Sequence, residues 1–201
     1  PVAVLSLAGA PRDDTWKRVN DALAQRLPQS AIAALEPILA ETMQQNDYAE
    51  AIKALGLKIA LEGQIQGNRP EEKIVRLRAA LATVPREMKP VLEAILAHWT
   101  WQYCQQNRWR FIQRTHTASA PGTDLQTWDL TQILGEIDRR FTAALADTAL
   151  LRATPIQTYD VLLEKGEAPD SYRPTLYDFL AYEALEFYQA GEQGAVTAED
   201  A

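Results

Sequence analysis

Apolar residues recur at intervals of three and four along most of the chain, which is the spacing of one face of a helix. Residues 16–27 show this spacing first, and the segment 174–190, rich in leucine and aromatic residues, shows it last. No segment alternates clearly with a period of two, apart from residues 109–112, which could form a short strand. The pattern predicts an all-α fold with eight or nine helices joined by short loops.

The longest helix is expected to run from Pro90 to about Gln106. Its apolar side chains cover two faces, and a helix that is apolar most of the way round is buried between neighbours. We therefore expect Leu96, Trp99 and Tyr103 at the centre of the fold. A second clean stripe predicts a helix over residues 130–145. Two start signals are possible here, Thr123 with Gln126 and Asp129 with Gln132.

Prolines mark several expected boundaries. Pro37 lies inside an amphipathic run and should kink or split its helix. Thr154, followed by a proline, is expected to cap a further helix. Pro174 should preset the first turn of the last helix, with Ser171 or Thr175 as its cap. On that helix, we expect Tyr177 and Leu180 to be buried against the helix of residues 130–145.

A repeated pattern bears on the architecture. Segments 35–40 and 92–97 both read Leu-Glu-x-Ile-Leu-Ala, and each is followed by Gln-Gln-Asn. This favours stacked antiparallel helix hairpins, a tetratricopeptide-like array, although chance similarity between leucine- and alanine-rich helices would also explain it. Residues 15–190 are then the helical domain, and residues 191–201 an acidic tail or linker.

The first residues, 1–14, form an expected N-terminal arm. Residues 1–10 are small and apolar, and Ala8-Gly9-Ala10 is typical of a signal-peptide cleavage site. The segment is therefore either the remnant of a signal peptide or an apolar arm that packs on the helical body.

Composition excludes several functions. Twenty basic and 27 acidic residues give a net charge of −7, which argues against a general nucleic-acid binder. The single cysteine, Cys104, cannot form an intramolecular disulfide and is expected to be buried and inert. Two histidines, His98 and His116, do not supply a metal site. No catalytic or cofactor-binding motif is present, and no run approaches the roughly 20 apolar residues of a membrane span. We therefore expect no enzymatic activity, cofactor, metal or membrane-spanning helix.

One region stands apart from this acidic background. Residues 94–123 contain no acidic side chain, but they contain Arg108, Trp109, Arg110 and Arg114. These four residues are the candidate contacts for a ligand or partner, because arginine binds carboxylates and phosphates and aromatic rings stack on bases. Three interpretations stay open: a connector whose arginines pair with acids elsewhere, a protein contact, and a site for a small anion or nucleic acid.

The segment from Arg173 to Tyr188 (RPTLYDFLAYEALEFY) is the most specific motif. It resembles the N-terminal helical region of bacterial alpha-2-macroglobulin-like proteins, the large protease-trap family. Shorter matches are Trp16, residues 27–31, the stretch from Asn107 to Thr115, and residues 127–129. Cys104 lacks the Cys-x-Glu-Gln pattern of the family's thioester.

The resemblance implies a non-enzymatic helical module of a larger secreted protein, at the cell surface or in the periplasm. Its partners would be neighbouring domains of the same polypeptide or another protein. The alternative is a stand-alone helical module that binds an anionic ligand through Arg108, Arg110 and Arg114.

Overall fold

The computed structural model describes residues 12–65, 67, 69–114, 122, 124–163 and 169–190. Over these residues the chain forms nine α-helices, four short 3₁₀ turns and no strand, which confirms the all-α prediction. The contacts divide the chain into two compact units, residues 1–69 and 70–201, which we call unit 1 and unit 2. Most of the expected arm (1–11) and the whole tail (191–201) lie outside the described residues.

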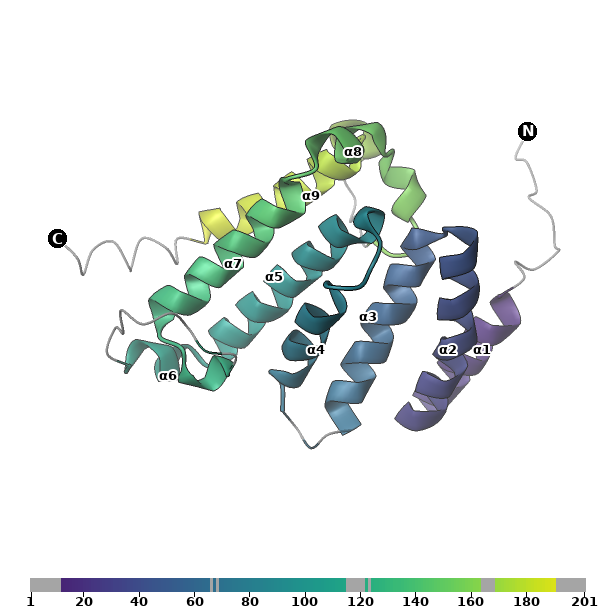
Figure 1. Cartoon of the computed structure of the whole chain (residues 1–201), viewed down its shortest axis with the longest axis horizontal. Coiled ribbons are helices and arrows are strands. Elements are labelled where there is room, and N and C mark those ends of the chain that lie inside the picture. Colours follow the sequence, from purple (N-terminus) through teal and green to yellow (C-terminus); the bar gives the residue numbers. More distant parts are fainter. Residues whose placement is uncertain are drawn as a thin grey trace. The chain divides into compact units, whose positions relative to one another are not determined.

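Unit 1 is built from three consecutive helices: α1 (Asp13–Ala24), α2 (Pro28–Gln45) and α3 (Tyr48–Ile65). Helix α1 thus begins inside the segment 1–14 that was expected to form the arm. Helix α2 packs against both α1 and α3 (Figure 1). The chain reverses over two or three residues between helices, and Arg26 and Asn46 adopt the positive φ values, 56° and 57°, of these tight turns.

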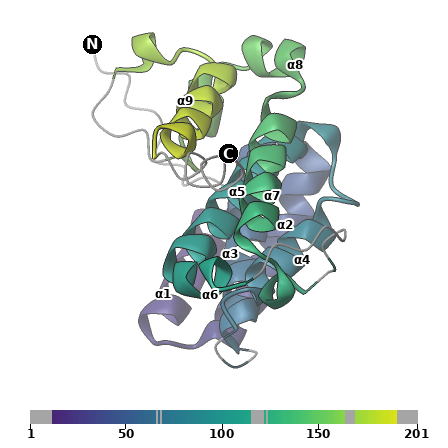
Figure 2. The same ribbon diagram turned by 90° about the vertical axis from the view of Figure 1, so that its left-hand side faces the viewer.

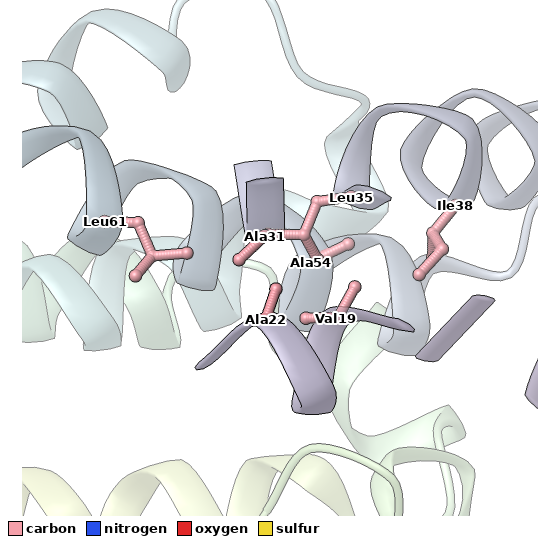
Figure 3. Close-up of a cluster of buried hydrophobic side chains, with 7 residues drawn as sticks. All are labelled: Val19, Ala22, Ala31, Leu35, Ile38, Ala54 and Leu61. Carbon is pink, nitrogen blue, oxygen red and sulfur yellow. The ribbon is translucent and has the colours of Figure 1, made fainter. Parts of the chain in front are cut away.

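The core of unit 1 is aliphatic and rich in alanine (Figure 3). Its buried members come from all three helices: Val19, Ala22, Ala31, Leu35, Ile38, Ala54 and Leu61. Alanine has almost no side chain to separate two helices, so the backbones can approach closely where these residues meet. The burial of this apolar surface is the main driving force that joins the three helices.

Proline does not interrupt α2. Pro37 lies within the helix, which is continuous from Pro28 to Gln45, so the expected split is wrong. Pro37 and Ala33 are both exposed, and water can therefore bind the Ala33 carbonyl that receives no hydrogen bond from a proline nitrogen. Pro28 begins α2, because the first helical position needs no N–H partner.

Unit 2 contains six α-helices. They are α4 (Glu72–Ala80), α5 (Lys89–Gln106), α6 (Arg108–Ile112), α7 (Leu130–Leu145), α8 (Thr148–Ala153) and α9 (Leu176–Gln189). Helices α5 and α7 pack side by side, and α6 lies at one end of this pair (Figures 1 and 2). The extent of α5 agrees with the expected helix from Pro90 to Gln106. Residues 109–112 belong to α6, so the possible short strand is wrong.

Side-chain caps define several helix starts. The Asp129 carboxylate accepts a hydrogen bond from the Gln132 backbone and the Gln132 side chain accepts one from the Asp129 backbone. Of the two possible starts, this confirms the second, at α7. Thr175 and Asp178 form the same reciprocal pair at α9. Pro174 therefore precedes the helix, so its expected place in the first turn is wrong.

The segment after α8 also differs from expectation. Thr154 does not start a further α-helix, because it is the C-cap residue of α8 and residues Ile156–Tyr159 form a 3₁₀ turn. The backbone N–H of Ile156 donates to the Pro174 carbonyl, and that of Leu176 donates to the Thr154 carbonyl. These bonds hold this stretch against the start of α9, and a continuing α-helix would forfeit them.

Aromatic rings fill the core of unit 2. Phe141 of α7 and Phe187 of α9 stack with their centroids 5.6 Å apart, and Trp101 of α5 meets Phe187 edge-on at 5.4 Å. Leu96 and Tyr103 are buried as expected. Trp99 is only half-buried, with the Lys73 ammonium 5.0 Å from its ring, so its expected central position is wrong.

Helix α9 packs against α5, α7 and α8. Leu180 is buried, as expected. Tyr177 is half-buried and its ring lies under the guanidinium of Arg152, at 4.8 Å. It therefore contacts α8 and does not share the burial of Leu180, contrary to expectation. Near the end of α9, the Tyr188 hydroxyl donates to Asp138 at 2.8 Å; burial, with this bond, raises the pKa of Tyr188 to about 12.

Candidate functional site

Helix α6 carries the most exposed tryptophan among the described residues. The Asn107 side chain donates to the Tyr103 carbonyl at 2.9 Å and ends α5, and α6 starts at the next residue. Phe111 is buried and meets the Tyr103 ring edge-on at 5.9 Å. With this side of α6 anchored, Trp109 is 63% exposed and Ile112 56% exposed. The two residues are three apart and therefore neighbours on the helix surface.

Arg114 has a structural role. Its Nη1 donates to the Trp128 carbonyl at 2.7 Å, and its guanidinium lies 5.9 Å from the Phe111 ring. These contacts join the end of α6 to Trp128, which lies two residues before the start of α7. Of the four predicted contact residues, Arg114 is thus engaged within the fold.

The other two arginines, Arg108 and Arg110, belong to α6 and are half-buried. Burial raises the pKa of Tyr103, and the Glu71 charge adds to this rise, while the charges of Arg110 and Arg114 oppose it. The charges of Arg110 and Arg114 thus partly offset the rise in the pKa of Tyr103. His116 lies outside the described residues.

The sequence pattern did not indicate Ile112 as a contact residue, because the candidate contacts are arginines and a tryptophan and Ile112 is neither. The available signal was its position three residues after Trp109, with the buried Phe111 between them. Residues at this spacing are neighbours on a helix surface. The structure thus brings Trp109 and Ile112 together on one exposed face, with Arg110 beside them in sequence. We call Trp109 and Ile112 the α6 face.

A cavity of about 320 Å³ lies in unit 2, between α5, α9 and the turn that ends at Leu163. Seven of its nine lining residues are apolar: Val91, Ala94, Ile95, Leu162, Leu163, Phe179 and Leu180. The other two are His98 of α5 and Glu183 of α9, whose Nε2 and Oε2 atoms lie 2.7 Å apart. The sequence offered no signal for this pair, because its members are 85 residues apart.

The imidazole of His98 is held by its neighbours. The Phe141 ring meets it edge-on at 5.6 Å, and the Trp101 ring lies tilted at 6.1 Å. Among the described residues, the lining includes no serine, threonine, cysteine, lysine or tyrosine. The polar groups that the described lining offers to a bound molecule are thus the side chains of His98 and Glu183.

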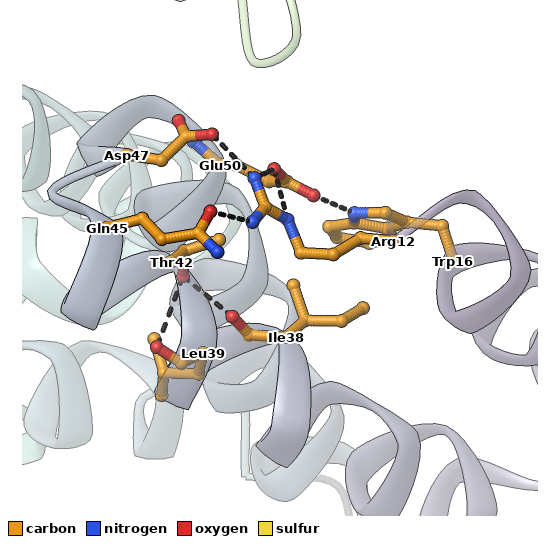
Figure 4. A network of polar contacts seen from close by, with 8 residues as sticks. All are labelled: Arg12, Trp16, Ile38, Leu39, Thr42, Gln45, Asp47 and Glu50. Carbon is orange, nitrogen blue, oxygen red and sulfur yellow. Dashed lines mark hydrogen bonds and ion pairs between the residues drawn. The ribbon is translucent and has the colours of Figure 1, made fainter. Parts of the chain in front are cut away.

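Two further clusters of charged residues are satisfied internally. In unit 1, the Arg12 guanidinium donates to Gln45, Asp47 and Glu50, at 2.5 Å, 2.8 Å and 2.5–2.8 Å (Figure 4). The Trp16 indole N–H donates to the second Glu50 oxygen. Burial raises the pKa of Glu50, but the hydrogen bonds from Arg12 and Trp16 outweigh burial and leave it below its usual value.

In unit 2, Arg140 is the counterpart of Arg12. It donates to Glu93 of α5 at 2.9 Å and to Glu136 of α7 at 2.8 Å, and Arg139 donates to Glu136 at 2.6 Å. Burial lowers the pKa of Arg140, but the bonds from the two glutamates outweigh it and raise the pKa overall. Both clusters join segments distant in sequence, which is a structural role.

Other expectations concern metals, thiols and membranes. Cys104 is fully buried, as predicted. Within the described ranges, no three histidine, cysteine or acidic side chains gather as a metal site would require. Of the described helices, none has both the length and the apolar character to cross a bilayer.

In comparisons with known proteins, no protein-family model, no curated protein and no solved structure matches this chain.

Proposed function

We propose that this chain is a non-enzymatic helical module that binds another protein surface through the α6 face. The observation that carries the proposal is the exposure of Trp109, 63%, beside Ile112 at 56%. Tryptophan and arginine are the residue types that most often dominate the energy of protein interfaces. An exposed indole on a fixed helix is therefore a candidate anchor.

The fold holds the α6 face in place before a partner binds. Phe111 is buried beneath α6, and Arg114 ties the end of the helix to the Trp128 carbonyl. A partner would therefore not have to order this segment when it binds. The interface avoids the entropic cost of ordering, which lowers affinity where a binding segment is flexible.

The surroundings favour one kind of partner. Residues 94–123 contain no acidic side chain, although the chain as a whole carries a net charge of −7. A protein surface with an apolar recess for the indole and acidic groups near Arg110 complements this region in shape and charge.

The wider setting of the proposal rests on the motif from Arg173 to Tyr188. Its resemblance to bacterial alpha-2-macroglobulin-like proteins supports a module of a larger protein, secreted, periplasmic or at the cell surface. The partner is then a neighbouring domain of the same polypeptide or another protein. We also propose that the helices belong to the tetratricopeptide-like type, because α1, α2 and α3 form consecutive hairpins.

The alternative, an anionic ligand held by Arg108, Arg110 and Arg114, has less support. Arg114 already donates to the Trp128 carbonyl, so binding an anion through all three guanidiniums would require it to leave that position.

Site-specific photocrosslinking in the source cells tests the proposal. A photoreactive residue at Gln113, which is exposed next to the α6 face, leaves Trp109 in place. We expect crosslinks to one defined peptide, rich in acidic and apolar residues. Trp109→Ala should abolish them without changing stability by more than about 0.5 kcal/mol.

A photoreactive residue at Tyr172, which is 73% exposed, is the matched control and should not give the same product. Crosslinks that persist in the Trp109→Ala variant, or that are shared by both positions, would contradict a contact at the α6 face. Whether the crosslinked peptide is encoded downstream in the same reading frame separates a neighbouring domain from another protein.

A further inference from the structure

The cavity between α5 and α9 has the size and lining of a small-molecule site. Binding pockets of about 300 Å³ and above are mainly apolar and contain a few polar groups that orient the ligand. This one, at about 320 Å³, has aliphatic or aromatic walls from α5, α9 and the turn before Leu163. A ligand without an apolar body would lose its hydration there without compensation.

The polar pair at the wall retains unused hydrogen-bonding capacity. Glu183 Oε2 bonds His98 Nε2, and the described residues give no partner to the other carboxylate oxygen of Glu183. An ionised carboxylate accepts several hydrogen bonds. Glu183 can therefore bind a donor group of a ligand while it keeps its bond to His98.

The charge of the pair selects the ligand head group. While Glu183 is ionised, the pair carries a net charge of −1 with neutral His98 and zero with protonated His98, and never a positive charge. The cation Arg173 lies over Phe179, but it also lies over Tyr182, which is 50% exposed. Arg173 is itself half-buried, and it is not among the described residues that line the cavity. A cationic head is favoured over an anionic one.

We propose that this cavity binds a small amphiphile with an apolar body and a primary amine, the body lying against Ile95, Leu163 and Phe179 and the ammonium bonding Glu183. An engineered cavity of about 150 Å³ holds benzene, so a cavity of about 320 Å³ has room for a phenyl ring with a short chain. The site is separate from the α6 face and does not depend on the proposed function.

Three probes of nearly equal shape test the proposal: 4-phenylbutylamine, 4-phenylbutanol and 4-phenylbutyrate. Isothermal titration with the whole chain should show the amine binding at least tenfold more tightly than the alcohol, and the carboxylate most weakly. Glu183→Gln keeps the side-chain shape and can still accept a bond from His98. It should weaken the amine about tenfold, or about 1.4 kcal/mol, and leave the alcohol within about threefold.

Two controls separate binding in the cavity from other effects. Ala94→Leu places extra atoms in the cavity and should weaken the amine and the alcohol together. Trp109→Ala should change neither, which distinguishes a failure here from a failure of the α6 face. Thermal melts of each variant show that it is folded. Equal affinity for amine and carboxylate, undiminished amine binding by folded Glu183→Gln, or no binding by the native chain would overturn the proposal.

Discussion

The two units bury different kinds of side chain. The cluster that joins α1, α2 and α3 is aliphatic, and three of its seven buried members are alanine. In unit 2 the largest fully buried side chains are Phe111, Phe141 and Phe187. Small residues stabilise unit 1 by letting helices approach closely, whereas rings stabilise unit 2 by filling a wider space. We therefore expect opposite sensitivities in the two cores. Larger side chains should destabilise unit 1, and smaller side chains should destabilise unit 2.

A buried arginine completes each core. Arg12 joins the start of α1 to residues 45–50 at the α2–α3 turn, and Arg140 joins α7 to Glu93 of α5. Breaking a buried pair leaves an uncompensated charge, which costs more than the pair contributes. Both arginines thus favour one arrangement of helices that apolar contacts alone would specify less strictly.

Phe141→Ala should have the largest effect on this comparison. Its ring is 1% exposed and contacts both Phe187 and His98. Loss of such a ring costs about 3–5 kcal/mol in transfer free energy and cavity formation. Urea unfolding of the whole chain should show this loss, and hydrogen exchange should place the added opening in peptides of unit 2. Phe141→Leu, which keeps most of the volume, should cost clearly less; equal losses would contradict a volume-limited core.

Leu180→Ala should come next, at about 2–5 kcal/mol, the range for a buried leucine. Because Leu180 already borders the cavity, we expect the lower part of this range. The matched control is Leu185→Ala on the same helix: Leu185 is 44% exposed, so its loss should lie within about 0.5 kcal/mol. If both variants melt at the native temperature, Leu180 is not part of the core.

Local signals explain what the sequence predicted. Periodicity and caps act within a few residues, so the extent of α5, the reciprocal pair of Asp129 and Gln132, and the burial of Leu180 followed from short stretches. Helix α6 has only five residues, too few to show a period. Its conformation depends on the burial of Phe111, which the local pattern does not contain.

Long-range pairs explain what it could not predict. Arg12 finds partners 33 to 38 residues away, and His98 finds Glu183 at a separation of 85 residues. Trp99 and Trp101 share an apolar helix, and only the position of α9 decides that Trp101 meets Phe187. The sequence could identify the candidate arginines by residue type, but it could not show that Arg114 forms a hydrogen bond within the fold.

Ala31→Leu tests the opposite failure, in unit 1. Ala31 has no exposed surface and lies in the alanine-rich cluster, so three added carbons must displace a helix or force strained rotamers. Overpacking of this kind costs about 1–3 kcal/mol. Ala33→Leu on the same helix is the control, because Ala33 is exposed. The free energy of unfolding in urea should be lower for Ala31→Leu than for Ala33→Leu. Native stability of Ala31→Leu would show that the core of unit 1 has room for the larger side chain.

Glu50→Gln should give the smallest effect and a pH signature. Replacing charge-assisted bonds to Arg12 and Trp16 with neutral ones should cost about 1 kcal/mol at neutral pH. The pKa of Glu50 in the folded chain lies below its ordinary value of 4.5, so its stabilisation is complete above that value and is lost as the pH falls through the folded pKa. Thermal melts should therefore show the native chain and the variant converging below about pH 4.5. Asp21→Asn, at an exposed position of α1, controls for the loss of one acidic charge. A difference between the native chain and Glu50→Gln that stays constant down to pH 2 would mean that the Glu50 charge does not stabilise unit 1.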